Sequence, residues 1–171
     1  MPTVEITRRL EFDAGHRIPD HKSKCRNAHG HRYVLEATIE GPVQEQVGRS
    51  DTGMVLDFGD LKTVMNDEVA EAWDHAFLVY DKDALMIQAL GLLGPNHKTI
   101  CLPFVPTVEN LAHEAFNLID KSLRTAGNQF SLQRLRLYET PNCYCDVSAP
   151  KGGNNGDTDR DRVTKGDRNL V

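Results

Sequence analysis

The amino-acid sequence predicts an α+β fold, and three observations support this class. Two stretches near the N-terminus alternate apolar and polar side chains around a polar loop, as a β-hairpin does. Two stretches with apolar residues at helical spacing follow, and two more alternating stretches flank residue 141. This order predicts a four-stranded antiparallel sheet with two helices on one face, whose open edge strands an oligomer would cover.

Length and composition indicate a single domain. Of 171 residues, 39% are hydrophobic and 26% are charged, which is enough apolar material for one core. The net charge of −5 gives no electrostatic support for nucleic-acid binding. No continuous apolar stretch is long enough to span a membrane. The four cysteines form no C-x-x-C pair and the start shows no secretory pattern. We therefore expect a cytoplasmic protein with reduced thiols, without nucleic-acid or membrane partners.

The first two strands are predicted at residues 4–16 and 29–40, with a loop at 17–28. Most even positions of the first strand are apolar, and His16 continues that row. The odd positions of the second strand are apolar in the same way, and His31 shares their parity. If the two strands pair as a hairpin, their histidines lie on one face of the sheet.

Three of these histidines form a candidate metal site. His29 and His31 are two residues apart, so on a strand their side chains leave the same face about 6–7 Å apart. His16 joins them across the hairpin, whereas His21 lies in the loop without strand parity and is expected to be solvated. Three imidazoles with an open fourth position are typical of catalytic zinc rather than of a closed structural site.

The same histidines and Cys25 can also be explained without a catalytic metal site. A histidine near a strand end is usually a hydrogen-bonded surface or core residue, and H-x-H alone has many chance matches. The third histidine on a matching strand favours metal binding. Cys25 could be a fourth ligand, a buried inert thiol, or an acid-base or nucleophilic group whose pKa a nearby zinc ion lowers.

The helices are predicted from caps and apolar spacing. Asp57 is a plausible N-cap for a first long helix that ends near residues 74–75. Residues 76–106 are the least regular part of the chain, with a short helix at 84–93, and are expected to form an insertion or a lid. Thr107 can cap a second long helix that ends near Gly127.

The last two strands are predicted at residues 130–140 and 142–149. One face of the first of these strands carries Leu135, Leu137 and Glu139. A charged residue at the end of an apolar row is unusual. The domain is therefore expected to span residues 1–150, and residues 151–171 form a polar tail without periodicity.

Several motifs, taken in order along residues 3–150, resemble the 6-pyruvoyl-tetrahydropterin synthase family. They are Phe12-x-Ala14-x-His16, Cys25-x3-His29-Gly30-His31, Gly53-Met54-Val55-Leu56-Asp57-Phe58-x-x-Leu61-Lys62, Asp74-His75, Pro106-Thr107-x-Glu109-Asn110-Leu111-Ala112 and Tyr138-Glu139-Thr140. The resemblance implies the tunnelling fold, in which sheets of several subunits close into an oligomeric barrel. It favours a homo-oligomer, a hexamer first, with active sites between subunits.

The spacing of one motif narrows the resemblance within the family. Three residues separate Cys25 from His29, as in the 6-carboxy-tetrahydropterin synthase branch of queuosine biosynthesis, whereas the pyruvoyl enzymes tend to have a longer gap. This branch implies conversion of 7,8-dihydroneopterin triphosphate to 6-carboxy-tetrahydropterin, acetaldehyde and triphosphate. A pyruvoyl synthase that eliminates triphosphate is the second candidate. A non-catalytic, zinc-stabilised oligomeric binding protein with Cys25 as fourth ligand is the third.

The resemblance also implies residue roles. The three histidines of the candidate site, His16, His29 and His31, would hold Zn²⁺. Cys25 would be the general base, and the pair Asp74 and His75 would pass protons on the other side of the substrate. The alternative for this pair is that it only terminates the first helix.

Two further residues are implied as contacts of the substrate, a small-molecule pterin triphosphate. Glu139 would anchor the pterin, because a carboxylate accepts two parallel hydrogen bonds from a guanidine-like edge. Thr107 is a substrate-binding candidate that also makes sense as a helix cap. The segment 76–106 looks longer than in compact relatives, and the tail after Pro150 has no counterpart.

Overall fold

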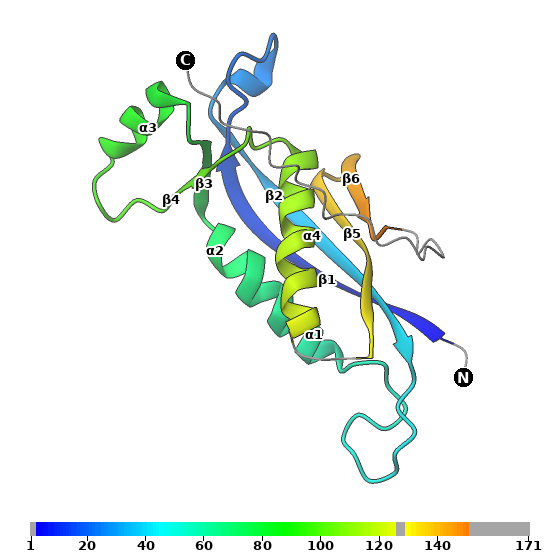
Figure 1. Cartoon of the computed structure of the whole chain (residues 1–171). Helices are drawn as coiled ribbons and strands as arrows, with labels where there is room; N and C mark the ends of the chain where they lie inside the picture. The colour runs from blue at the N-terminus through cyan, green and yellow to red at the C-terminus, as the bar shows by residue number, and fades with distance from the viewer. Residues whose placement is uncertain (1–2, 126–128, 151–171) are drawn as a thin grey trace, which may run out of the picture.

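The structure is a computed structural model that describes residues 3–125 and 129–150. Within these residues, six strands form one sheet in the order β4-β3-β1-β2-β5-β6 (Figure 1). The strands are β1 (Thr3–His16), β2 (His29–Pro42), β3 (Ala76–Tyr80), β4 (Thr99–Leu102), β5 (Ser131–Thr140) and β6 (Cys143–Ser148). The helices are α1 (Phe58–Met65), α2 (Glu71–Trp73), α3 (Ala84–Gly91) and α4 (Val108–Thr125), with the π-helical turn η2 (Asn66–Ala70) joining α1 to α2.

The long hairpin of β1 and β2 is the centre of the sheet. The two strands pair antiparallel over their whole length, from Thr3 opposite Pro42 to His16 opposite His29. The predicted hairpin is therefore confirmed. Strand β5 pairs antiparallel with β2, and β6 with β5, so the two predicted C-terminal strands are also present.

The expectation of a four-stranded, purely antiparallel sheet is wrong. Strand β3 pairs parallel with β1, and β4 pairs parallel with β3. Both strands come from residues 76–106, the segment expected to form an insertion or a lid, so that segment extends the sheet at its edge. The reason for the miss is physical: β3 is a short run with buried neighbours such as Leu78 and Val79, and a strand buried on both faces shows no alternation.

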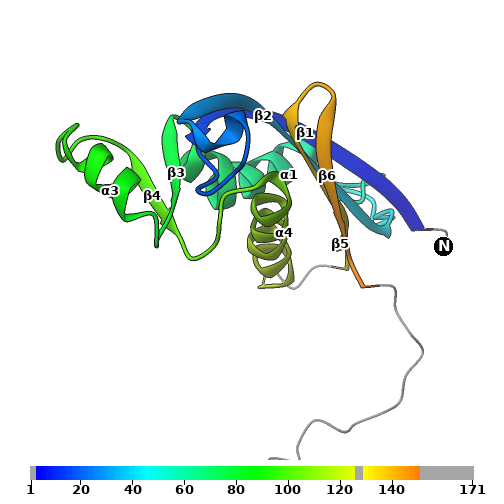
Figure 2. The same cartoon turned by 90° about the horizontal axis from the view of Figure 1, so that it is seen from above.

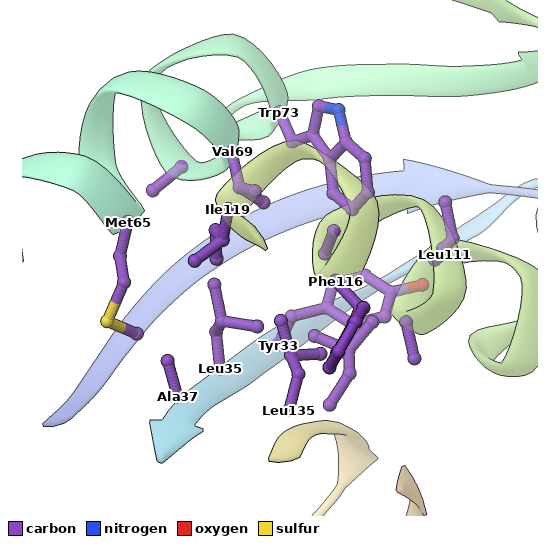
Figure 3. Packing of buried hydrophobic residues seen from close by; sticks show 14 of the residues in the cluster. Tyr33, Leu35, Ala37, Met65, Val69, Trp73, Leu111, Phe116, Ile119 and Leu135 are labelled. Carbon is purple, nitrogen blue, oxygen red and sulfur yellow. The ribbon is translucent and has the colours of Figure 1, made fainter. Parts of the chain in front are cut away.

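One face of the sheet is covered by helices. Figure 2 shows α1 and α4 on the same side of the curved sheet, with α3 beside the β4 edge. Side chains of α4, among them Leu111, Phe116 and Ile119, pack toward Tyr33 and Leu35 of β2 (Figure 3). The two helices expected on one face are thus present, the first as the continuous run of α1, η2 and α2 and the second as α4, and α3 lies outside that layer.

Local capping accounts for where the helices begin. The Asp57 side chain accepts a hydrogen bond from the Gly59 amide, 2.6 Å away, at the start of α1. The Thr107 carbonyl and hydroxyl accept from the amides of Leu111 and Asn110 at the start of α4. The predicted end of this helix, Gly127, and the predicted tail 151–171 lie outside the described residues.

The other face of the sheet is polar. In the central strands its side chains alternate with the buried ones, and they include Arg9, Glu11, Arg32 and Glu36. No helix of residues 3–125 and 129–150 is long and apolar enough to cross a membrane.

Candidate metal centre

The three histidines predicted as metal ligands lie together at one end of the central hairpin. His16 ends β1 and lies directly opposite His29, and His31 lies opposite Ala14. The ring centroids are 4.6 Å apart for His16 and His29, 4.9 Å for His29 and His31, and 5.2 Å for His16 and His31. One ligand nitrogen from each ring lies within 4.8 Å of the others, a spacing that one ion can bridge.

Backbone carbonyls orient two of these rings. The Nδ1 of His16 lies 2.7 Å from the Pro106 carbonyl oxygen, and the Nδ1 of His29 lies 2.7 Å from the Asn27 carbonyl oxygen. Because a carbonyl only accepts, Nδ1 carries the proton in both rings and Nε2 keeps its lone pair. This is the arrangement in which a histidine binds a metal through Nε2.

The cluster contains polar atoms that lack protein partners. The Nε2 atoms of His16 and His31 are buried and, among the described residues, accept no hydrogen bond. Buried polar atoms in native proteins are nearly always paired, so two unpaired lone pairs at one point fit a bound cation. Three imidazole donors suit zinc with one coordination position open.

Burial favours the neutral form of the His16 and His31 imidazoles. Desolvation lowers the pKa of His16 to about 4; the hydrogen bond to Pro106 opposes this, and repulsion by His29 and His31 adds to it. Burial also lowers the pKa of His31, against the attraction of the Glu139 carboxylate. Neutral imidazole is the form that donates a lone pair to a metal ion.

Glu139 of β5 faces the histidines. Its Oε1 lies 3.5 Å from the Nε2 of His16 and 3.9 Å from the Nε2 of His31, and its side chain is 22% exposed. The Glu139 carboxylate, which ends the apolar row of β5, therefore lies beside two imidazoles rather than among apolar side chains. Because the carboxylate is partly exposed to solvent, it can accept hydrogen bonds from a ligand that binds beside the histidines.

Tyr33 packs beside the histidine cluster, a position that the sequence analysis did not single out. Its ring centroid lies 5.7 Å from that of His31 and 6.1 Å from that of His16, and its hydroxyl is buried without a partner in the described part of the chain. Burial and the charge of Glu139 raise its pKa, so the hydroxyl keeps its proton. The sequence does place Tyr33 on the same face of the strand as His29 and His31, because the three residues are spaced two apart.

Cys25 lies in the loop that joins the two strands carrying the histidine cluster. It is the middle residue of the short turn η1 (Lys24–Arg26), and its carbonyl accepts a hydrogen bond from the Ile18 amide, 2.8 Å away. Its side chain is partly exposed. Over residues 3–125 and 129–150, the group of mutually close ligand atoms contains the three histidines and not this thiol.

Asp74 and His75 form a carboxylate–imidazole pair at the end of α2. Asp74 accepts hydrogen bonds from the Asp13 amide and from the His75 Nδ1, both at 2.8 Å. The hydrogen bond from the Asp13 amide lowers the pKa of Asp74 most, and the hydrogen bond from His75 lowers it further, so the carboxylate is ionised. The His75 ring is 79% exposed, with its backbone in the left-handed region at φ 55°. The pair both ends the helix and orients an accessible imidazole.

The His75 ring borders a cavity on the polar face of the sheet. The cavity has a volume of about 500 Å³, and Asp13, Gly15 and Arg32 line it together with His75. The side chains of Asp13 and Arg32 leave the strands opposite to those of their neighbours Ala14 and His31. The cavity therefore lies mainly on the face away from the helices, and it also reaches His31 at the end of the hairpin.

Thr107 caps helix α4, as the sequence predicts. The residue before it, Pro106, supplies the carbonyl that holds His16. Thr107 is thus one residue from a partner of the metal cluster, and its predicted contact with a substrate stays a prediction.

Comparison with known proteins identifies the family. The family model described as 6-pyruvoyl tetrahydropterin synthase matches residues 5–150. The chain therefore belongs to the 6-pyruvoyl tetrahydropterin synthase family.

Two relatives within this family carry the same name. The 6-carboxy-5,6,7,8-tetrahydropterin synthase of Rickettsia felis is 40% identical over 144 residues, which are 84% of this chain and 99% of that protein. The protein of the same name from Haemophilus influenzae is 33% identical, over 83% of this chain and 96% of that protein.

Solved structures share the fold. An uncharacterized protein from Wolinella succinogenes superposes with a TM-score of 0.69 at 20% identity, covering 88% of this chain and 100% of that one. The 6-pyruvoyl tetrahydropterin synthase of Caenorhabditis elegans superposes with a TM-score of 0.60 at 26% identity, covering 88% of this chain and 98% of that one.

Proposed function

We propose that the protein is a zinc-dependent 6-carboxy-5,6,7,8-tetrahydropterin synthase of queuosine biosynthesis. It converts 7,8-dihydroneopterin triphosphate and one water molecule to 6-carboxy-tetrahydropterin, acetaldehyde and triphosphate. The observation that carries the proposal is the cluster of His16, His29 and His31, with its unpaired Nε2 atoms, in a chain that aligns with 99% of a relative of that name. The cysteine pattern also supports a cytoplasmic location.

The three histidines would hold Zn²⁺ through their Nε2 atoms. When bound, the ion supplies Lewis acidity, which makes the hydroxyl and adjacent C–H protons of a bound substrate side chain easier to remove. The carbonyls of Asn27 and Pro106 keep two of the imidazoles in the ligating tautomer.

Proton transfer is assigned to residues outside the cluster. Cys25 would act as general base from the loop beside the histidines, and the Asp74–His75 pair would serve the other side of the substrate. Asp74 holds the Nδ1 proton of His75, so the exposed Nε2 is the atom that exchanges protons with a ligand.

Glu139 would anchor the pterin ring. A carboxylate accepts two parallel hydrogen bonds from an amino group and a ring N–H, a pattern that matches the guanidine-like edge of a pterin. The position of Glu139 within 4 Å of two ligand histidines supports a ring bound with its side chain at the metal. Thr107, at the start of α4, is the second substrate-binding candidate.

The side chains of His16 and His75 lie on different faces of the sheet, although His31 also lines the cavity beside His75; this separation supports active sites built between subunits. His16 is fully buried under the start of α4, whereas His75 borders the cavity on the polar face. A second copy that brings its His75 to the metal side would complete the site. A closed homo-oligomer, with a hexamer favoured, would do this for every subunit and would cover the sheet edges.

Product analysis tests the proposal against the pyruvoyl alternative. The purified, zinc-loaded protein is incubated with 7,8-dihydroneopterin triphosphate, and the products are identified by mass spectrometry. We expect a carboxypterin and acetaldehyde, because the gap between Cys25 and His29 has three residues. A pyruvoyl product would contradict this choice within the family, and a protein that binds the substrate without turnover would support the binding-protein alternative.

A further inference from the structure

The loop between β1 and β2 carries a charge opposite to that of the chain. Residues 17–28 contain the cations Arg17, Lys22, Lys24 and Arg26 and one acid, Asp20, in a protein whose net charge is −5. A local excess of positive charge in an acidic protein attracts anions to that place.

This loop encloses a cavity. Its volume is about 560 Å³, and its lining includes the cations Arg17, Lys22 and Arg26, the acid Asp20, and His21 and Asn27. Within the described residues, neither Lys22 nor Arg26 forms an ion pair, whereas Arg17 is paired with Asp83. Two cations without an ion-pair partner in the described residues therefore line one cavity, where cations outnumber the single acid Asp20 by three to one.

The loop is held in shape by its own contacts. The guanidinium of Arg17 donates two hydrogen bonds to the Asp83 carboxylate, which is 4% exposed. The Ile18 amide donates to the Cys25 carbonyl across the loop, and the Ser23 amide donates to the Nδ1 of His21 at 3.0 Å. A loop fixed in this way presents its cations at a lower entropic cost on binding.

Two residues that line the cavity are linked to the histidine cluster. Arg17 directly follows the ligand His16, and Asn27, which lines the cavity, gives its carbonyl to the ligand His29. Cys25 belongs to the same loop. The loop that carries Lys22 and Arg26 therefore begins directly after His16 and ends directly before His29.

We propose that this cavity binds the triphosphate of the substrate, with Lys22 and Arg26 as its main contacts. The identity of the ligand rests on the proposed function, in which the reacting side chain at the metal carries the triphosphate. A polyphosphate has several anionic oxygens, which the forked guanidinium of Arg26 and the ammonium of Lys22 contact together. His21 adds a third donor at the same wall.

Calorimetric titration with inorganic tripolyphosphate tests the site without any turnover. The Lys22→Ala/Arg26→Ala protein is compared with wild type and with Arg49→Ala/Lys62→Ala, a control that removes two exposed cations elsewhere. We expect binding to weaken at least about tenfold in the first variant and to be unchanged in the control. Equal weakening in both variants, or in neither, would overturn the site. Zinc content is measured on every sample because polyphosphates chelate metals.

Substrate kinetics separates this proposal from the proposed function. Lys22→Ala/Arg26→Ala should raise KM for 7,8-dihydroneopterin triphosphate and leave the affinity for 7,8-dihydroneopterin, which lacks the phosphates, unchanged. If tripolyphosphate binding is lost selectively but no variant or wild type turns over the substrate, the polyphosphate site stands and the enzyme assignment fails. If turnover yields carboxypterin with an unchanged KM, the enzyme assignment stands and the site is wrong.

Discussion

At the scale of single residues, the orientation of the imidazoles decides what the cluster can bind. Carbonyls of Pro106 and Asn27 fix the Nδ1 protons of His16 and His29, and burial keeps His16 neutral. The lone pairs left over converge on one point. A metal bound there should depend strongly on each ring.

Replacing one ligand should remove the metal. We expect His29→Ala to weaken zinc binding by at least about 100-fold, because the loss of a supporting contact alone costs 10–100-fold. The measurement is zinc per chain after dialysis, by elemental analysis. His113→Ala, which removes an exposed histidine of α4, is the matched control and should keep its zinc. Full zinc content in His29→Ala would show that the ion binds elsewhere.

Glu139 should affect substrate affinity more than metal affinity. In Glu139→Gln the amide keeps the shape of the side chain but loses one charged acceptor, so we expect KM to rise about 10-fold or more. Zinc content should stay at the wild-type level. The control is Glu36→Gln on the polar face of the sheet, which should leave KM unchanged. Loss of zinc in Glu139→Gln would assign the carboxylate to the metal instead of the pterin.

At the scale of elements, the Arg17–Asp83 pair joins the cysteine-bearing loop to α3. Asp83 accepts both hydrogen bonds of the Arg17 guanidinium and also caps α3 through the Met86 amide. These contacts, Arg17 first, lower the pKa of Asp83. The pair therefore stabilises the folded state as long as the carboxylate is ionised.

The stabilising effect of this pair should depend on pH. We expect Arg17→Ala to lower the free energy of unfolding by about 1–3 kcal/mol at pH 7, because it leaves a buried carboxylate unpaired. A carboxyl group with a depressed folded pKa stabilises above its unfolded value of about 3.9 and loses that effect as the pH falls through the folded pKa. The difference between wild type and variant should therefore shrink below about pH 4.

Urea unfolding at several pH values measures this difference. Arg124→Ala, which breaks the exposed pair with Asp120 on α4, is the control and should change stability by about 0–1 kcal/mol. A difference for Arg17→Ala that is independent of pH, or no larger than the control's, would contradict the role of the pair.

Sequence patterns predicted the long elements and missed the short ones for physical reasons. The hairpin of β1 and β2 and the convergence of its histidines follow from local alternation, which the sequence displays directly. Strands β3 and β4 have five and four residues and pair in parallel with distant partners, so no local period reports them. The approach of Glu139 to the histidines depends on the pairing of β5 with β2, which only the structure gives.

At the scale of the whole molecule, one sheet carries two chemically different faces. The helix side holds the histidine cluster, and the polar side holds the cavity beside His75. A site that needs Cys25 and His75 together is therefore expected to draw them from different copies of the chain.

Mixing two inactive variants tests this arrangement. Cys25→Ala and His75→Ala should each be inactive alone, and hybrid oligomers formed by co-refolding or co-expression should regain activity in about one quarter of their sites. Each active site in a hybrid takes its thiol from one variant and its imidazole from the other. Mixtures that stay inactive, although hybrids form by mass, would mean that both residues of a site come from the same chain.

Cys25 decides between two kinds of site: three histidines that hold the metal beside a catalytic thiol, or four ligands that include the thiol. Measuring zinc content and turnover on Cys25→Ala separates these two sites most directly, with Cys101→Ala, an exposed cysteine of β4, as the control. We predict one zinc ion per chain, as in wild type, together with loss of carboxypterin formation. Loss of zinc and of stability in Cys25→Ala, with the control unchanged, would make the thiol a fourth ligand of a structural site and contradict the account.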